Sequence, residues 1–184
     1  MKTLFLNERM TYDGTQLHSL YTYLTHKVQG DSALAFIGPC NISFDHMVDG
    51  EDLLERSEIR GSEMLHFIFE IFDRELVSGI FLQRLLATLI SDEIYQLTQK
   101  KLEREGDDLY WEKKKLSISI ATSSSISTLV HFAVNISNQG TPVPTCSLED
   151  FKINPRSFGE KILKKISEEY ESILVARVKV RPVQ

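Results

Sequence analysis

Two neighbouring segments in the middle of the chain alternate apolar and polar residues, and this feature constrains the fold most strongly. Successive side chains of a β-strand point to opposite faces. Residues 115–122 therefore place Leu116, Ile118 and Ile120 on one face. Residues 129–136 do the same with Val130, Phe132, Val134 and Ile136. Because residues 124–126 fit a three-residue hairpin loop, the sequence predicts an antiparallel strand pair here.

The same pairing predicts a pocket. With a three-residue loop, Lys115 lies across from Asn135, and Ser119 lies across from His131. The small and polar side chains of both strands, Ser117 included, then share one concave face with a cation at its edge. Such a face is typical of a pocket for an anionic or amphipathic small molecule. The alternative is a hairpin whose second face is simply solvated.

A resemblance to the central part of the biotin and lipoate protein ligases is carried by residues 107–117, 133–138 and 145–148. Those enzymes share the fold of the class II aminoacyl-tRNA synthetases. In them an Asn-Asp pair opens a strand, and a lysine contacts the carboxylate or acyl-adenylate. A later strand ends in Asn. Asp108 matches the Asp, Lys115 the lysine and Asn135 the Asn. The whole chain is also similar to a small family of conserved proteins of unknown function placed near these ligases.

Two departures from the ligase pattern concern the reaction. The ligases hold the activated acid with a glycine- and arginine-rich loop in the first half, where this chain has only residues 38–41 and 59–62, the latter including Arg60 and Gly61. Ile118 also stands where the ligases carry a glycine, so the backbone cannot approach a ligand as closely there. The resemblance therefore implies the fold more firmly than the reaction, because one fold hosts many activities.

Length and composition favour one self-sufficient domain. A chain of 184 residues without repeats or long linkers is expected to form a single domain over 1–184, which buries roughly 70% of its unfolded surface without staples. Cys40 and Cys146 lack a CxxC spacing, so reduced, partly buried thiols are expected. The amino terminus turns polar after three apolar residues, and no later stretch reaches the roughly 20 apolar residues of a membrane helix.

These features also limit the expected cellular location and binding partners of the protein. We expect a cytoplasmic protein that does not bind a membrane. The formal charge of −5 argues against a nucleic-acid partner. The sequence leaves the oligomeric state open, a homo-oligomer included.

Residue periodicity predicts an α+β fold in which helices flank a mixed or antiparallel central sheet, as the ligase resemblance also implies. Strands are expected near residues 3–6, 32–37, 64–72, 115–122, 127–136 and, as an edge, 177–181. Helices are expected from Thr15 to about Gly30, from Ile80 to about Arg104, and from Pro155 with Asn154 before it. Residues 41–58 are expected to be acidic and irregular.

Two further groups of residues have chemical potential. Residues 38–52 hold Cys, Asp, His and Glu side chains that are competent for metal binding or acid–base chemistry. Their spacing matches no metal motif, and no metal site is predicted. A hydrolase that uses Cys40 and His46 ranks third among the functions, because no nucleophile motif supports it. His66 and His131 lie in predicted strands, which favours hydrogen-bonded structural histidines.

Two functions of different classes remain. The first is a carboxylate-activating or acyl-transferring enzyme in which Lys115 neutralises the substrate carboxylate or adenylate, Ser119 and Asn135 orient it, and Arg60 beside Gly61 holds phosphate. The resemblance implies ATP as its co-substrate. The second is a non-catalytic module that binds a small carboxylic or acyl ligand. Only the enzyme needs another anion-binding group near Lys115, so the position of Arg60 discriminates the two. The remaining predicted ligand-binding residues are Asp108, Ser117 and His131.

Overall fold

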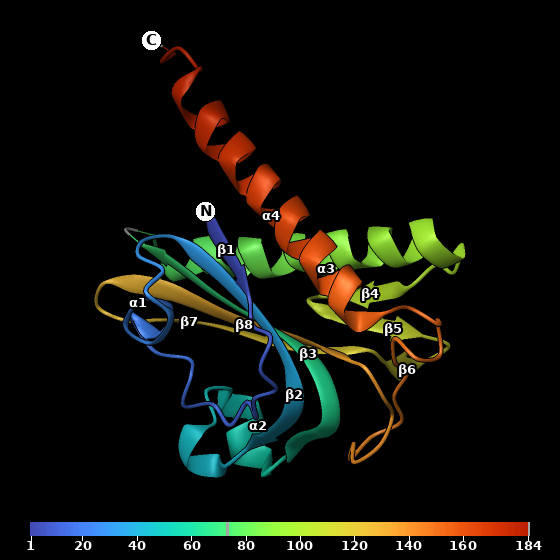
Figure 1. Cartoon of the computed structure of the whole chain (residues 1–184). Coiled ribbons are helices and arrows are strands. Elements are labelled where there is room, and N and C mark those ends of the chain that lie inside the picture. The colour runs from blue at the N-terminus through green and yellow to red at the C-terminus, as the bar shows by residue number, and fades with distance from the viewer. Residues whose placement is uncertain (73, 184) are drawn as a thin grey trace.

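The computed structural model describes residues 1–72 and 74–183, and it has a mixed α+β architecture (Figure 1). The main sheet has the strand order β1-β2-β3-β8-β7, and a smaller sheet has the order β4-β5-β6. The strands are β1 (Lys2–Phe5), β2 (Ser32–Ile42), β3 (Ile59–Phe72), β4 (Glu103–Glu105), β5 (Asp108–Trp111), β6 (Lys114–Lys115), β7 (Ser117–Ser123) and β8 (Ser127–Asn135). The helices are α1 (Tyr21–His26), the 3-10 helix η1 (Phe44–His46), α2 (Gly50–Glu55), α3 (Leu76–Thr98) and α4 (Pro155–Val178).

The predicted fold class is confirmed. The β1–β2 pair is parallel, whereas β2–β3, β3–β8 and β7–β8 are antiparallel, so the main sheet is mixed. The helix predicted from Ile80 is α3. The helix predicted from Pro155 is α4, and Asn154 caps it by accepting a hydrogen bond from the backbone N–H of Ser157 at 3.0 Å.

Helices α3 and α4 cover one face of the main sheet (Figure 1). Their apolar sides meet alternate residues of the two central strands: Leu65, Phe67, Phe69 and Ile71 of β3 with Val130, Phe132 and Val134 of β8. Gly79 lets α3 approach β8 closely, because a Cβ atom there would lie 2.3 Å from the Cγ2 methyl of Thr128. This packing makes the larger of the two hydrophobic clusters.

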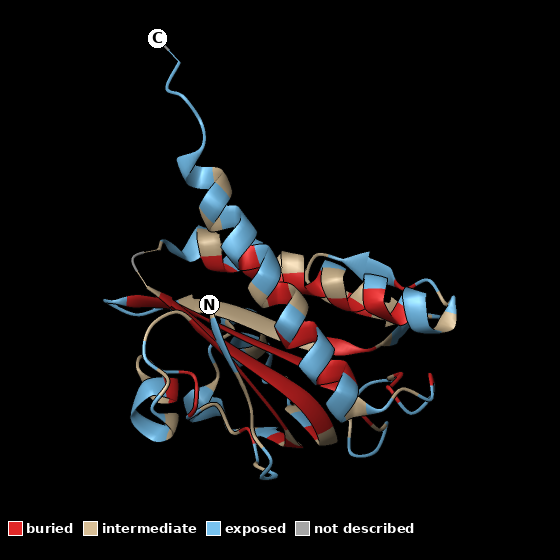
Figure 2. Cartoon of the chain, turned by 45° about the horizontal axis from the view of Figure 1, so that its top comes forward, coloured by how far each residue is buried: buried red, intermediate tan, exposed pale blue. Residues whose placement is uncertain are grey.

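Buried Glu93 of α3 joins the two helices. Its carboxylate forms ion pairs with the ammonium groups of Lys161 and Lys165 on α4 at 2.6 and 2.7 Å. A carboxylate that is buried on a helix requires such partners, because an unpaired charge there would be costly. The pairs fix α4 on α3, whereas the far half of α4 extends beyond the sheet and is exposed (Figure 2).

The opposite face of the sheet carries the second hydrophobic cluster. The strand residues in it include Leu34, Phe36, Met64, Ile68, Leu129 and Ala133, and the segment before β2 adds Tyr12 and Leu17. Glu70 of β3 ties down the start of α1, since it accepts hydrogen bonds from the backbone N–H of Leu20 at 2.8 and 3.0 Å. Every residue of β8 is therefore buried, on both faces of the strand (Figure 2).

The pairing of β7 with β8 corrects the predicted register by one residue. Ser119 lies opposite Phe132, and His131 lies opposite Ile120. Four residues, rather than three, separate the last paired positions, Ser123 and Thr128. A shift of one residue turns every side chain to the other face.

As a result, Ile118 and Ile120 share the face of His131 and Asn135. Ser117 and Ser119 point toward the face that the helices cover. Lys115 is not opposite Asn135; it belongs to β6 and pairs with Tyr110 of β5.

Several predicted element boundaries were wrong. The first helix is short, since α1 covers only Tyr21–His26. Strand β2 does not stop at residue 38 but continues to Ile42 through an irregularity in its pairing. Helix α3 ends at Thr98, where Gln99 adopts a left-handed conformation. Residues 177–181 form no strand, because α4 continues to Val178. The segment 41–58 contains η1 and α2.

Within the described ranges, no helix combines the length and apolar character needed to cross a membrane.

Val134→Asp is expected to unfold the protein. Val134 is fully buried in the helix-covered cluster, so a carboxylate there would lack both water and a partner, at a cost of at least about 4 kcal/mol. Val175→Asp is the matched control, because Val175 lies on the exposed part of α4 and is 62% exposed. Circular dichroism melts would show a large loss of melting temperature for the first variant alone. Equal melts would contradict this placement of β8.

Candidate functional site

A cavity of about 510 Å³ opens on the face of the main sheet opposite α3 and α4. This volume lies within the range of small-molecule pockets. Its floor is formed by strands β7 and β8, and its walls by residues 42–60, residues 107–108 and the loop 141–145. Residues from distant parts of the chain thus meet at one pocket.

The corrected register determines which side chains form the floor of this pocket. Ile118 and Ile120 of β7 lie beside His131 and Asn135 of β8, and Met64 of β3 adjoins Asn135. The floor is therefore mostly apolar, with His131 at the middle of β8 and Asn135 at its end. A flat apolar body bounded by a few polar groups is what such a surface accommodates.

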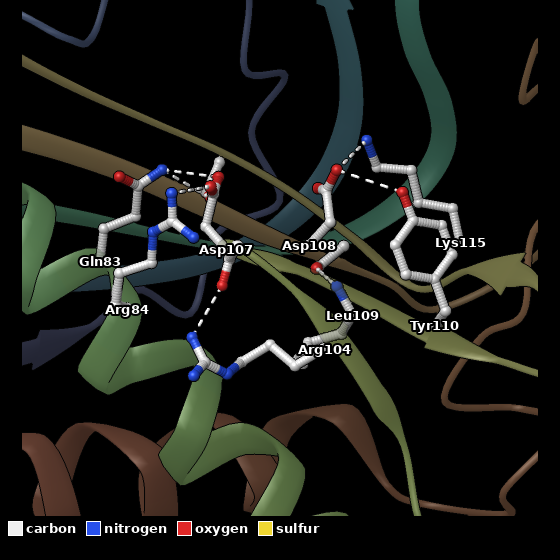
Figure 3. Close-up of polar contacts among 11 residues, drawn as sticks. Gln83, Arg84, Arg104, Asp107, Asp108, Leu109, Tyr110 and Lys115 are labelled. Carbon is white, nitrogen blue, oxygen red and sulfur yellow. Dashed lines mark hydrogen bonds and ion pairs between the residues drawn. The ribbon is translucent and has the colours of Figure 1, made fainter.

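Lys115 supplies the cation at one edge of the pocket. Its Nζ atom lies 2.8 Å from Oδ2 of Asp108, and the hydroxyl of Tyr110 donates to the same oxygen at 3.3 Å (Figure 3). Burial alone would lower the pKa of Lys115, but the hydrogen bond and charge of Asp108 outweigh it and raise that pKa. The ammonium therefore stays charged at neutral pH.

The neighbouring carboxylate, Asp107, points away from Lys115 (Figure 3). It accepts hydrogen bonds from Gln83 at 2.7 Å and Ser119 at 2.6 Å, and it lies 3.3 Å from the guanidinium of Arg84. Asp107 thus connects α3 to β7, and the Ser119 hydroxyl already has a partner. Because successive residues of the chain point in opposite directions, only Asp108 is directed to the lysine.

Three other predicted site residues, Arg60, Gly61 and Ser117, differ in their positions. Arg60 lines the same pocket as Lys115, with an exposed side chain that pairs with Glu58 at 3.0 Å. Gly61 does not line the pocket, and a Cβ atom there would lie 3.0 Å from the sulfur of Met64. Ser117 lines it but is buried, and its hydroxyl accepts from the backbone N–H of Leu109 at 3.1 Å.

Asn135 positions the lysine. Its side-chain amide donates to the carbonyl oxygens of Lys115 at 3.1 Å and Cys146 at 3.2 Å. These bonds join the end of β8 to the short strand that carries the cation. Asn135 therefore holds the backbone of Lys115 in place at the edge of the pocket.

His66 and His131 form a buried hydrogen-bonded pair, as expected for structural histidines. Nδ1 of His66 lies 3.1 Å from Nε2 of His131. Burial lowers the pKa of His66 to about 4. Burial and the neighbouring His66 hold the pKa of His131 well below its usual value. Both imidazoles are therefore neutral near pH 7.

Tyr12 is a pocket residue that sequence reasoning missed. Its ring stacks on His131 with 3.6 Å between ring centroids, and its backbone pairs with Cys40. The sequence indicated only a turn at this tyrosine. The contact joins residues more than a hundred positions apart, so no local pattern could have revealed it.

The segment 38–52 gives no support for the hydrolase hypothesis. The Cys40 thiol is buried, which raises its pKa to about 12, and the His46 ring contacts Ser43 at 3.2 Å. Cys146 is also buried, with its pKa raised to about 11. A thiolate is the reactive form of cysteine, so neither is activated. Among residues 1–72 and 74–183, no three His, Cys, Asp or Glu side chains gather to hold a metal ion.

Carboxylates outnumber cations around the pocket. The cationic lining residues are Arg60 and Lys115, whereas six lining residues carry carboxylates: Asp49, Glu51, Asp52, Glu58, Asp107 and Asp108. Both cations are already paired with one of them. The pocket can therefore accept a single negative charge at Lys115 more readily than a polyphosphate.

Comparison with known proteins places this arrangement in a family. A family model described as a domain of unknown function, DUF366, matches residues 1–181. An uncharacterized protein of Methanocaldococcus jannaschii is 30% identical over 175 residues, which cover 92% of this chain and 78% of that protein. A solved structure of a protein of unknown function from Pyrococcus horikoshi is 36% identical, with a TM-score of 0.96 and coverage of 100% of this chain and 99% of that one.

The biotin protein ligases share the fold at greater distance. The Aquifex aeolicus enzyme, solved in complex with biotin and ATP, is 21% identical with a TM-score of 0.59. The match covers 91% of this chain and 69% of the ligase. The predicted similarity to the ligase fold is confirmed.

The stability of the fold is expected to fall as the pH is lowered from about 6.5 toward about 4. His66 and His131 stay neutral in the folded state, whereas unfolded histidines take up protons below their usual pKa of 6.5. Proton uptake by the unfolded state alone lowers stability, by up to about 1.4 kcal/mol per pH unit for each histidine. Urea titrations between pH 7 and pH 4 would measure this slope.

His131→Phe keeps an aromatic ring and removes one titrating group, so its slope should be shallower. His18→Gln, at an exposed histidine, should keep the slope of the unmodified protein. A His131→Phe slope equal to that of the unmodified protein would contradict the neutral pair.

Proposed function

Because this chain belongs to the DUF366 family, whose function is unknown, its activity must be argued from the pocket, and we propose that it binds a small carboxylic or acyl ligand there. The observation that carries the proposal is the position of the Lys115 ammonium at the edge of a pocket of about 510 Å³ with an apolar floor. The ligand's carboxylate would lie at Lys115. Its apolar body would lie over Ile118 and Ile120.

The hydrogen bonds of Lys115 support this placement. A lysine ammonium has three N–H donors, and Asp108 accepts from one of them. The other two can serve a ligand carboxylate without breaking the existing ion pair. Asn135 holds the backbone of this lysine in place, which reduces the cost of ordering the site on binding.

Lys115→Ala is expected to weaken the binding of such an acid by roughly 1.5–3 kcal/mol, about one to two decades in affinity. The variant loses a charge-assisted contact and leaves Asp108 to repel the ligand. Lys113→Ala is the control, because Lys113 lies in the turn after β5 with a left-handed backbone and outside the pocket lining. A thermal-shift screen of biotin, lipoate, fatty acids and ATP would find a ligand. Titration calorimetry would then compare the variants.

Equal losses in the two variants would indicate a diffuse basic edge. No loss in either would place the ligand elsewhere.

A second candidate is an enzyme that activates the acid with ATP. It is favoured by one observation: Arg60 lines the same pocket as Lys115. In such a step a carboxylate oxygen attacks the α-phosphorus of ATP, and the bond to pyrophosphate breaks. Arg60 would have to exchange Glu58 for the phosphates, because the two side chains are paired.

Pyrophosphate release in the presence of an acid that binds is the test of this second candidate. Arg60→Ala should abolish the release and leave the affinity for the acid unchanged. Arg56→Ala, an exposed arginine of the same segment that does not line the pocket, should keep the release intact. Binding of the acid without any pyrophosphate release would leave the binding module as the function.

A further inference from the structure

A chain of hydrogen bonds fixes the protonation of both buried histidines. Nε2 of His66 lies 3.2 Å from the carbonyl oxygen of Gly38, which can only accept a hydrogen bond. This nitrogen therefore carries the proton. In the neutral ring, Nδ1 of His66 is then the acceptor, so Nε2 of His131 must donate to it across 3.1 Å. The remaining nitrogen of His131, Nδ1, bears a lone pair and no proton.

That nitrogen has no hydrogen-bond partner in residues 1–72 and 74–183. No hydrogen bond joins Nδ1 of His131 to another described residue. The side chain is 2% exposed and lines the pocket. In the described part of the chain, Nδ1 is not one of the fully buried polar atoms that lack a partner, so it keeps some access to solvent. The small accessible part of this imidazole therefore presents an acceptor to the pocket.

One flat side of the imidazole is covered and not available to a ligand. Tyr12 stacks on it with 3.6 Å between centroids and 8° between the ring planes. A ligand cannot stack on that face, whereas Nδ1 lies at the ring edge. An acceptor at a ring edge forms a directional hydrogen bond, which is more selective than an apolar contact.

The acceptor and the backbone that carries the cation are separated along β8. His131 and Asn135 are four residues apart on β8, which corresponds to about 13 Å along a strand. Asn135 holds the backbone of Lys115. Ile118, opposite Ala133, lies between these two levels of the floor, and Ile120 lies beside His131. The pocket thus has a cation toward one end and an uncharged acceptor toward the other.

We propose that His131 selects ligands by accepting a hydrogen bond, so that the acid bound by this protein carries an O–H or N–H group at the end remote from its carboxylate. This inference rests on the proposed function, because it assumes that the carboxylate lies at Lys115. It adds the chemical class of the group at the end of the ligand that is remote from the carboxylate. An acid with a methyl or other purely apolar terminus leaves the acceptor of His131 desolvated and unpaired, which weakens its binding.

The first test is the tautomer itself in the protein without ligand. Nitrogen-15 NMR of the histidine side chains distinguishes a protonated ring nitrogen from an unprotonated one. We expect a protonated Nε2 and an unprotonated Nδ1 for His131 at pH 7. A proton on Nδ1 would overturn the inference, because the pocket would then present a donor.

The second test uses probes matched in length. Fatty acids of increasing chain length are compared by calorimetry with their ω-hydroxy and ω-methoxy derivatives. At the length that spans the floor, the ω-hydroxy acid should bind about fivefold tighter than the parent acid. The ω-methoxy acid accepts but cannot donate a hydrogen bond, so it should gain nothing. This control also excludes donation from the Tyr12 hydroxyl as the source of the gain.

His131→Phe should remove the advantage of the hydroxyl while the parent acid still binds. Thermal melts show whether this variant folds, and the methoxy comparison on the unmodified protein does not depend on it. If the parent acids bind in a way that requires Lys115 but the hydroxyl adds nothing at any length, the inference is wrong and the proposed function stands. If no acid of any series binds, both are wrong.

Discussion

The register of β7 against β8 is the constraint on which the candidate site depends. It places Ile120 opposite His131 and Ser119 opposite Phe132. A shift by one residue would exchange the two faces of β7. The serine hydroxyls would then point into the pocket, and the isoleucines would point toward α3. In the observed register, the Ser119 hydroxyl donates a hydrogen bond to Asp107 on the side of α3. The pocket floor near Lys115 and His131 is therefore apolar.

Strand β8 is buried on both faces, so each polar group on it needs a partner. Asn135 donates to two backbone carbonyls, and Ser127 donates to buried Glu70 at 2.7 Å. On the pocket side, one ring nitrogen of His131 has no hydrogen-bond partner among the described residues. An unpaired ring nitrogen on a buried strand is a feature that a ligand can use.

The pairing of its cations distinguishes this pocket from a general anion-binding site. Asp108 holds Lys115, Glu58 holds Arg60, and Asp107 holds Arg84, so each cation around the pocket has its own carboxylate. An anionic ligand would therefore bind to a cation that is already paired with a carboxylate of the protein. This balance suits a monocarboxylic acid, whereas a nucleotide would require rearrangement of the Arg60 pair. The common fold with the biotin protein ligases does not decide between these cases.

The sequence by itself determined the local features. Alternation in 64–72 and 127–136 predicted two central strands, and Asn154 before Pro155 predicted the start of α4, because periodicity and capping depend only on neighbouring residues. The resemblance to the ligases named the fold and pointed to Asp108 and Lys115 as site residues.

Only the tertiary structure decided the register of β7, the stacking of Tyr12 on His131 and the presence of Arg60 in the same pocket as Lys115. Periodicity states which residues of one strand share a face. The alignment of two strands depends instead on the turn between them and on long-range packing, which no local pattern contains.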